Sequence, residues 1–273
     1  MATVIDLQST EDTSVLRRLA RQSLENTASP CFMIQNFGFE KLLQSVVERA
    51  SAHSREGDDD GVAGRVNSRA HFDLKTSETE DDPMYDDFRD QMKILARRLA
   101  SILFGEEAVL DVELDGSLSV KSYANDRRDH SELTLESSSN SSTSNIRLGA
   151  HVDGNMFTIL WSNAPGLQVL RPDKEVVADD IMFYGMPLIG VSPSFEVEED
   201  DFIDVEADWS SGSVMLVTVG RSWFSPSNPL TKNSEMIVKC PVLHRVAFPD
   251  RDGEPRRSVP FLVNVKLAEP GDA

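Results

Sequence analysis

One short segment, Leu148–Asp153, constrains the fold of this chain more than any other, because it places His151 and Asp153 two positions apart. Side chains alternate between the two faces of a β-strand, so residues i and i+2 point the same way. On a strand, His151 and Asp153 would therefore face one metal ion, while Val152 would face the packed side. The apolar residues that flank the pair, in 146–150 and 156–161, are typical of strands. The segment predicts a strand that carries two ligands of a single ion.

A third ligand must come from elsewhere in the chain, because so short a pair cannot surround an ion. His244 follows the apolar run 236–243, which also has the character of a strand. Two imidazoles and one carboxylate form the ligand set of a non-haem iron(II) site with open coordination positions. Arg256 lies shortly beyond His244, and its planar guanidinium could hold the carboxylate of an acidic co-substrate.

A histidine two positions before an acid is weak evidence by itself. The chain has 5 histidines and 46 acidic residues, so one such pair is expected by chance. Two further pairs exist, and both are interpreted as structural. His71 and Asp73 follow a polar stretch rich in Gly and Asp, while His130 and Glu132 lie in a charged run typical of a solvated loop. The downstream residues distinguish His151 from these two.

Taken together, these residues resemble the plant-type and fungal small-molecule branch of the 2-oxoglutarate- and iron(II)-dependent oxygenases, the isopenicillin-N-synthase-like enzymes. Leu148–Asp153 resembles the family's Leu-Gly-x-His-Thr-Asp strand, with Val152 in place of Thr. The other matches follow in the family's order: Gly166–Val169, Ser213–Gly220 (a strand ending in Asn-x-Gly-Asp in the family), His244–Val246, and Arg256-x-Ser258 followed by Pro260–Asn264. Val4–Leu7 and Phe32–Gly38 match as well, so the resemblance covers nearly the whole chain.

The resemblance implies a function and a set of site residues. His151, Asp153 and His244 would bind Fe(II), and no catalytic side chain beyond these ligands is implied. Arg256 and Ser258 would hold the distal carboxylate of the co-substrate 2-oxoglutarate. Tyr123 falls where the family has a Tyr whose hydroxyl often helps to hold this co-substrate. The implied reaction couples oxidation of a small-molecule substrate by O2, by default its hydroxylation, to decarboxylation of 2-oxoglutarate to succinate and CO2.

The chain departs from the family pattern at several positions. Lys121, Ala124 and Asn125 replace family residues around Tyr123, and Arg221 stands where the family has Asp. Two inserts are present as well. Residues 136–145 are nearly all Ser, Thr and Asn and predict a flexible loop. The other insert, in 173–208, contains the acidic run 196–208, which is interpreted either as a mobile flap over the pocket mouth or as a solvated edge strand.

Three alternatives stay open at this stage. An iron oxidase of the same fold would keep the metal ligands without using 2-oxoglutarate, although Arg256-x-Ser258 argues against it. A catalytically idle relative could act as a binding module; Arg221 and the inserts favour it, and the intact ligand set weighs against it. A sugar-binding or structural jelly roll would need no metal ligands at all.

Charge and cysteine content narrow the class of protein further. The formal net charge is −19, whereas nucleic acids and anionic membranes are bound through a surplus of Lys and Arg. No apolar run approaches the ~20 residues of a membrane span, and no signal-peptide pattern begins the chain. Cys31 and Cys240 lie in apolar stretches and are interpreted as reduced core thiols. These features predict a cytoplasmic enzyme that acts on a small molecule, with a monomer as the expected state.

The apolar spacing divides the chain into a helical front and a β-rich back. Helical periodicity predicts helices over 13–25, 39–52 and 84–104, the first capped by Asp12 or Thr13 and the last ended by Gly105. From Ser117 onward, short apolar runs separated by turn residues predict a two-sheet jelly roll. Residues 1–115 are thus predicted to be the helical N-terminal region of one domain, and residues 116–273 its core, a double-stranded β-helix in the family.

Overall fold

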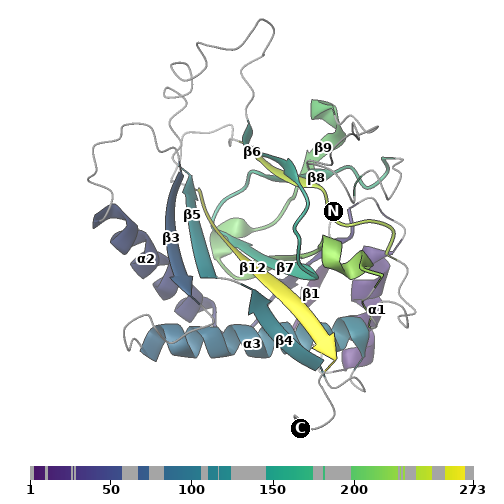
Figure 1. Cartoon of the computed structure of the whole chain (residues 1–273), viewed down its shortest axis with the longest axis horizontal. Helices are drawn as coiled ribbons and strands as arrows, with labels where there is room; N and C mark the ends of the chain where they lie inside the picture. The colour runs from purple at the N-terminus through teal and green to yellow at the C-terminus, as the bar shows by residue number, and fades with distance from the viewer. Residues whose placement is uncertain are drawn as a thin grey trace, which may run out of the picture.

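The computed structural model of the chain describes residues 3–9, 12–25, 27, 29–56, 67–73, 83–105, 110–115, 117–123, 146–174, 181, 198–226, 228, 230, 238–247 and 256–267. Within this part of the chain, the strands form one eight-stranded sheet and one four-stranded sheet (Figure 1). The insert 136–145 lies outside the described residues, so its prediction as a loop is not tested.

The larger sheet draws its strands from both halves of the chain. Its order is β1-β2-β10-β7-β12-β5-β3, and β4 pairs with β12 beside this path. The strands are β1 (Val4–Asp6), β2 (Cys31–Gln35), β3 (Asn67–Asp73), β4 (Leu110–Asp115), β5 (Ser117–Tyr123), β7 (Phe157–Ser162), β10 (Val214–Val219) and β12 (Arg256–Leu267). The predicted helical front therefore also supplies four strands, β1 to β4. Of these, β2, β3 and β4 pair with strands of the back, and β1 pairs with β2.

The smaller sheet has the order β6-β11-β8-β9. Its strands are β6 (Ile146–His151), β8 (Leu167–Leu170), β9 (Phe202–Asp204) and β11 (His244–Ala247), and all of its pairings are antiparallel. In Figure 1, β6, β8 and β9 lie together at one end of the molecule.

The strands β2 and β10 of the larger sheet are buried on both faces. Phe32 and Ile34 pack into a core cluster with the helices, whereas Cys31 and Met33 pack into another with residues of the smaller sheet. All six residues of β10 are buried as well. A strand covered on both sides is apolar at successive positions, which explains the continuous apolar runs in the sequence. The two sheets therefore face each other across an apolar layer, and the helices cover the far face of the larger one.

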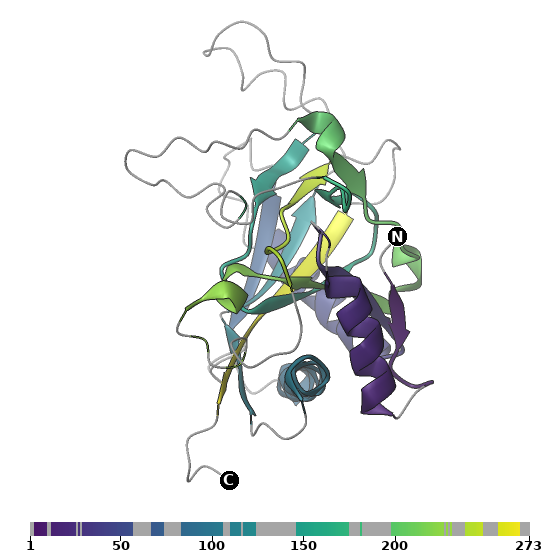
Figure 2. The same ribbon diagram turned by 90° about the vertical axis from the view of Figure 1, so that its right-hand side faces the viewer.

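Three helices form that cover: α1 (Thr13–Leu24), α2 (Glu40–Glu56) and α3 (Pro83–Phe104), the last seen nearly end-on in Figure 2. The predicted helices are confirmed, including two of their ends. The Asp12 carboxylate accepts the Ser14 backbone N–H at 2.8 Å, which caps α1. Gly105 follows α3 with a φ of 108°, a conformation that glycine adopts without strain. None of the described helices is long and apolar enough to cross a membrane.

The acidic insert is an edge of the smaller sheet, so the flap hypothesis is wrong for the described part, 198–208. After the 3-10 turn Glu199–Asp201, β9 pairs with β8, and Phe202 and Val205 are buried. Asp201 is buried too, and its carboxylate lies 2.5 Å from the Lys174 ammonium. The other acidic side chains point to solvent: Glu198, Glu199, Asp200, Asp204, Glu206 and Asp208. Apolar side chains of this segment face the core and most of its acidic ones face solvent, and the one buried carboxylate is paired with Lys174. A segment with many like charges can therefore pack against the smaller sheet.

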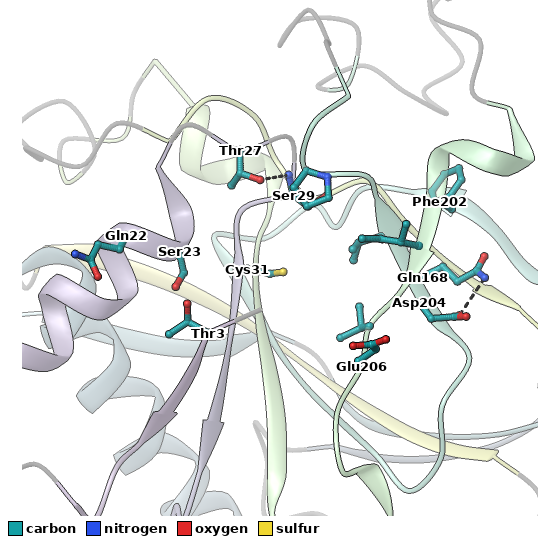
Figure 3. A pocket seen from close by; sticks show the side chains of 14 residues that line it. Thr3, Gln22, Ser23, Thr27, Ser29, Cys31, Gln168, Phe202, Asp204 and Glu206 are labelled. Carbon is teal, nitrogen blue, oxygen red and sulfur yellow. Dashed lines mark hydrogen bonds between the residues drawn. The ribbon is translucent and has the colours of Figure 1, made fainter. Parts of the chain in front are cut away.

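The two cysteines are free and buried, which confirms their interpretation as reduced core thiols. Burial raises the pKa of the Cys31 thiol to about 12. Cys31 borders a cavity of about 660 Å³ between the end of α1, the start of β2, and β8 and β9 (Figure 3). The described residues that line this cavity include no histidine and no arginine, so it is distinct from the predicted metal site.

Candidate metal centre

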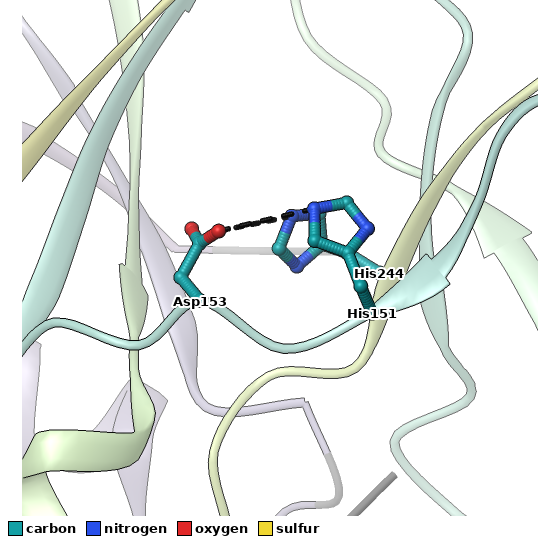
Figure 4. Close-up of side chains that lie close together, drawn as sticks. All are labelled: His151, Asp153 and His244. Atoms are coloured by element: carbon teal, nitrogen blue, oxygen red, sulfur yellow. Dashed lines mark ion pairs between the residues drawn. The ribbon is translucent and has the colours of Figure 1, made fainter. Parts of the chain in front are cut away.

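The strands β6 and β11 bring the two predicted histidine ligands together. They pair antiparallel with His151 opposite His244, and the two imidazole ring centroids lie 4.3 Å apart. The prediction of one strand that carries both ligands is wrong for Asp153, because β6 ends at His151 and Asp153 lies in the loop two residues further on. Its carboxylate nevertheless turns toward both rings (Figure 4). One ligand atom from each of the three side chains lies within 4.8 Å of the others. The structure thus assembles the triad that the spacing predicts.

The distances within the triad suit a metal ion better than direct hydrogen bonds. Asp153 Oδ1 lies 3.8 Å from His151 Nε2 and 3.9 Å from His244 Nε2, which is too long for hydrogen bonding. Bonds of about 2.1 Å to one ion would place neighbouring ligand atoms roughly 3 Å apart. Small side-chain rotations would therefore close the three atoms around an ion.

Backbone carbonyls orient both imidazoles for this role. His151 Nδ1 lies 2.9 Å from the Gly149 carbonyl oxygen, and His244 Nδ1 lies 3.2 Å from that of Val242. A carbonyl only accepts, so each Nδ1 is the donor, and Nε2 is the ring nitrogen that a neutral imidazole offers to a metal. A second hydrogen bond of this kind fixes the tautomer and direction of metal-binding histidines. The donor set, two imidazole Nε2 atoms and one carboxylate oxygen, fits iron(II).

A neighbouring strand supports the carboxylate. Thr158, in β7, donates its hydroxyl to Asp153 Oδ2 at 2.6 Å, and the buried Asn155 amide contacts the same hydroxyl at 3.1 Å. Val152, between the two ligands, is 7 % exposed and packs in a core cluster, as the alternation predicts. Thr158 and Asn155 were not predicted from the sequence, because contacts within a loop leave no periodic signal.

The loop that carries Asp153 is clamped by the segment after β10. The Arg221 backbone N–H donates to the Asp153 carbonyl at 2.8 Å, and the Ser222 N–H donates to that of Asn155 at 3.1 Å. A Cβ on Gly220 would stand 2.2 Å from the Asn155 carbonyl oxygen, so this close approach requires glycine. Arg221, the departure from the family's Asp, therefore supports the loop through its backbone.

Arg256 and Ser258 line the same cavity as the triad. They lie two positions apart in β12, so both point to the face that the triad occupies. The guanidinium of Arg256 is buried, with 1 % exposure. The cavity is lined by Leu148, His151, Asp153, Thr158, Leu160, Leu167, Thr218, His244, Val246, Arg256, Ser258 and Pro260.

Gly166 allows Arg256 to lie where it does. Its φ is 113°, and a Cβ there would stand 2.8 Å from the Ala247 carbonyl oxygen and 3.5 Å from Arg256 Cδ. Its own carbonyl accepts the Ala247 N–H at 2.8 Å. The Gly-Leu-Gln-Val match therefore has a physical basis, because only glycine combines this conformation with this contact.

The structure gives only backbone positions for Tyr123 and for the pair of His71 and Asp73. Tyr123 ends β5, and its backbone is paired with Arg256 of β12. His71 and Asp73 belong to β3, which pairs with β5. The third pair, His130 and Glu132, lies outside the described residues. The register thus sets Tyr123 beside Arg256 along the sheet.

Solved structures share this fold. A full-length protein from Neurospora crassa, in complex with alpha-KG, matches with a TM-score of 0.58 and 15% identity, over 96% of this chain and 84% of that one. AtDAO1, a dioxygenase for auxin oxidation from Arabidopsis thaliana, as a 2-oxoglutarate complex, matches with a TM-score of 0.51 and 14% identity, over 100% and 94%. JOX2 in complex with 2OG, Fe and JA matches with a TM-score of 0.51 and 15% identity, over 97% and 75%.

The comparisons define the fold class. The chain matches no protein-family model and no curated protein. Its structural neighbours include dioxygenases solved with 2-oxoglutarate, and the likeness extends over nearly the whole chain. The chain therefore has the double-stranded β-helix fold of the iron- and 2-oxoglutarate-dependent oxygenases, with flanking helices. The predicted fold is confirmed.

Proposed function

We propose that this chain is an iron(II)- and 2-oxoglutarate-dependent oxygenase that hydroxylates a small molecule and releases succinate and CO2. One observation carries the proposal: His151, Asp153 and His244 share a cavity with the buried guanidinium of Arg256. The three metal ligands alone do not indicate which co-substrate the site binds. A buried guanidinium on the wall of the same cavity supports a carboxylate co-substrate, because its planar donors match the two oxygens of a carboxylate.

Each site residue has a distinct role in this proposal. His151 Nε2, His244 Nε2 and Asp153 Oδ1 would hold the iron, and Arg256 with Ser258 would hold the distal carboxylate of 2-oxoglutarate. Tyr123, from its position paired with Arg256, would help to hold the same molecule. When bound, iron and 2-oxoglutarate supply the oxidising chemistry with O2.

The rest of the cavity wall would keep water away from the reacting atoms. Four apolar side chains line it beside the triad: Leu148, Leu160, Leu167 and Val246. Excluding water strengthens the charge interactions inside and prevents side reactions. His151 is the most open ligand, with 34 % of its side chain exposed, against 18 % for Asp153 and 11 % for His244. The substrate is therefore expected to approach from the side of His151.

A small organic molecule is the substrate class that the charge supports. The net charge of −19 disfavours nucleic acid and anionic membranes, and it suits a cytoplasmic enzyme. The Neurospora crassa protein was also solved with thymine, and JOX2 with JA, which adds support by analogy of fold.

The test measures iron binding and 2-oxoglutarate turnover in the purified protein. We expect one Fe(II) per chain, and succinate release that requires both iron and 2-oxoglutarate. His151→Ala and Asp153→Ala should lose the bound iron, whereas Asp200→Ala, at an exposed acid outside the triad, should keep it. Iron stoichiometry that is unchanged in both triad variants would contradict the metal site.

The same experiment separates the alternatives. Substrate oxidation that needs iron but no 2-oxoglutarate would indicate an oxidase of the same fold. Iron and 2-oxoglutarate binding without succinate release under any substrate would indicate an idle binding relative. A metabolite screen that follows succinate release would then identify the substrate.

A further inference from the structure

We propose that Thr158 is a positioning residue that decides which oxygen of Asp153 binds the metal ion. This inference rests on the proposed metal site. Thr158 lies in β7, and Asp153 lies in the loop between β6 and β7, five positions earlier. The Thr158 hydroxyl donates to Asp153 Oδ2 at 2.6 Å, and the residue is 2 % exposed. Nothing in the triad itself supplies this restraint.

The direction of the hydrogen bonds makes the restraint specific. A metal-binding carboxylate only accepts, and Asp153 Oδ2, at 2.6 Å, is nearer to the Thr158 hydroxyl than its other acceptor, the Asn155 amide oxygen at 3.3 Å. The single hydroxyl proton of Thr158 therefore points toward the charged and nearer Asp153 Oδ2. The Asn155 amide nitrogen lies 3.1 Å from the same hydroxyl oxygen and donates to it. Asn155 is 4 % exposed, and its amide also donates to the Phe157 carbonyl, which holds the amide group in this orientation. The chain Asn155 to Thr158 to Asp153 therefore has one direction.

The consequence is that Asp153 turns Oδ1 toward the two histidines and holds Oδ2 against Thr158. The two shortest contacts from Asp153 to the histidine Nε2 atoms, 3.8 and 3.9 Å, both run through Oδ1. With Oδ2 engaged by Thr158, the carboxylate would bind through one oxygen. Three protein ligand atoms leave about three positions open on an octahedral ion. A carboxylate that bound through both oxygens would remove one of those positions.

The experiment compares three variants by titration of the purified, iron-free chain with cobalt(II), whose absorption spectrum reports its coordination. Thr158→Val keeps the shape of the side chain but removes the donor, and Thr158→Ser restores it. Thr218→Val is the matched control: Thr218 is paired with Thr158 across the sheet and lines the same cavity, yet no described hydrogen bond joins it to the triad. Loss of such a supporting contact typically weakens metal binding ~10- to 100-fold.

We expect Thr158→Val to weaken cobalt(II) binding by about 10-fold or more and to change the absorption spectrum. Thr158→Ser and Thr218→Val should stay within about 3-fold of the original chain, a difference well below that loss. Urea unfolding of every variant shows whether the fold is kept. If Thr158→Val binds cobalt(II) as the original chain does, or if Thr158→Ser fails as badly as Thr158→Val, the inference is wrong while the proposed function stands. If the original chain binds no cobalt(II), both are wrong.

Discussion

Arg256 is the residue on which the co-substrate part of the proposal depends. Replacing it by Lys keeps the charge but loses the planar pair of donors that fits a carboxylate. Loss of a hydrogen bond to a charged group costs ~1.5–3 kcal/mol, so 2-oxoglutarate should bind about 10- to 150-fold more weakly. Saturation of succinate release with 2-oxoglutarate measures the change.

The neighbouring arginine provides the control for this substitution. Arg257 is the next residue of β12 and points to the opposite face, and its backbone N–H donates to the Asn163 side chain at 2.6 Å. Arg257→Lys should therefore leave 2-oxoglutarate binding unchanged. If Arg257→Lys weakens binding while Arg256→Lys does not, the register of the predicted co-substrate site is wrong by one residue.

Gly166 tests whether the wall beside Arg256 tolerates a side chain. Gly166→Ala forces a φ of 113° on alanine and sets its Cβ 2.8 Å from the Ala247 carbonyl oxygen. Such a conformation costs ~1–3 kcal/mol for a residue other than glycine, so the free energy of unfolding should fall by about that amount in a urea titration. Gly149→Ala, whose Cβ would meet nothing within 4 Å, should be neutral by comparison. Equal effects of the two substitutions would refute the close-packing argument.

Among single residues, the sequence predicted the metal ligands but not the side chains that hydrogen-bond to them. His151 and Asp153 could be predicted as a pair because their spacing is local, although Asp153 lies in the loop after β6 and not on the strand. The family resemblance located His244 and Arg256. Thr158 was missed because its contact with Asp153 depends on the conformation of the loop between β6 and β7, which no apolar periodicity predicts. Tyr123 stays a prediction, supported by its register beside Arg256.

An ion pair holds the turn that leads into the edge strand β9. Lys174 donates to the Asp201 carboxylate at 2.5 Å, and the Glu198 backbone N–H donates to it at 2.9 Å. These hydrogen bonds, the Lys174 contact first, lower the pKa of Asp201 below its ordinary value of 3.8. Arg245 adds a second anchor, because its guanidinium lies 4.2 Å from the Phe202 ring centroid and donates to the Glu199 carbonyl.

Asp201→Asn should destabilise this edge in a pH-dependent way. A folded-state pKa below the unfolded value means that the carboxylate contributes stability above pH 3.8, and loses that contribution as the pH falls through the folded pKa. The difference in the free energy of unfolding between the original chain and Asp201→Asn should thus be largest near neutral pH. It should shrink in acid. Urea titrations at several pH values measure it, and a difference that grows in acid would contradict the assigned ion pair.

The elements were predicted well where their signals are local. Apolar spacing and the caps at Asp12 and Gly105 located the helices within a few residues. The acidic run left two interpretations open, a flap or an edge strand, because charge density is a local property, whereas the burial of Asp201 depends on Lys174, 27 positions away. Strands β2, β3 and β4 were likewise hidden among helices, since their partners β10, β5 and β12 lie in the β-rich back.

At the scale of the whole molecule, the candidate metal site lies between the two sheets, and the helices cover the opposite face of the larger sheet. The triad comes from β6, the loop after it and β11, while Arg256 and Ser258 come from β12 across the sandwich. A metal bound by the triad and a co-substrate bound by both walls would therefore join the two sheets. Binding free energy at such a site adds directly to the free energy of unfolding, because the unfolded chain cannot form the site.

The two ligands should consequently stabilise the fold in a fixed order. Cobalt(II) alone should raise the melting temperature, and 2-oxoglutarate should raise it further only when the metal is present. At 100 times the dissociation constant, a ligand stabilises by ~2.7 kcal/mol, which corresponds to roughly 5–10 °C for a chain of this size. Arg256→Lys should keep the metal increment and lose most of the second one, whereas Asp153→Ala should lose both. Stabilisation by 2-oxoglutarate that is equally large without metal would place its binding outside the cavity of the triad, because there the two ligands are expected to act together.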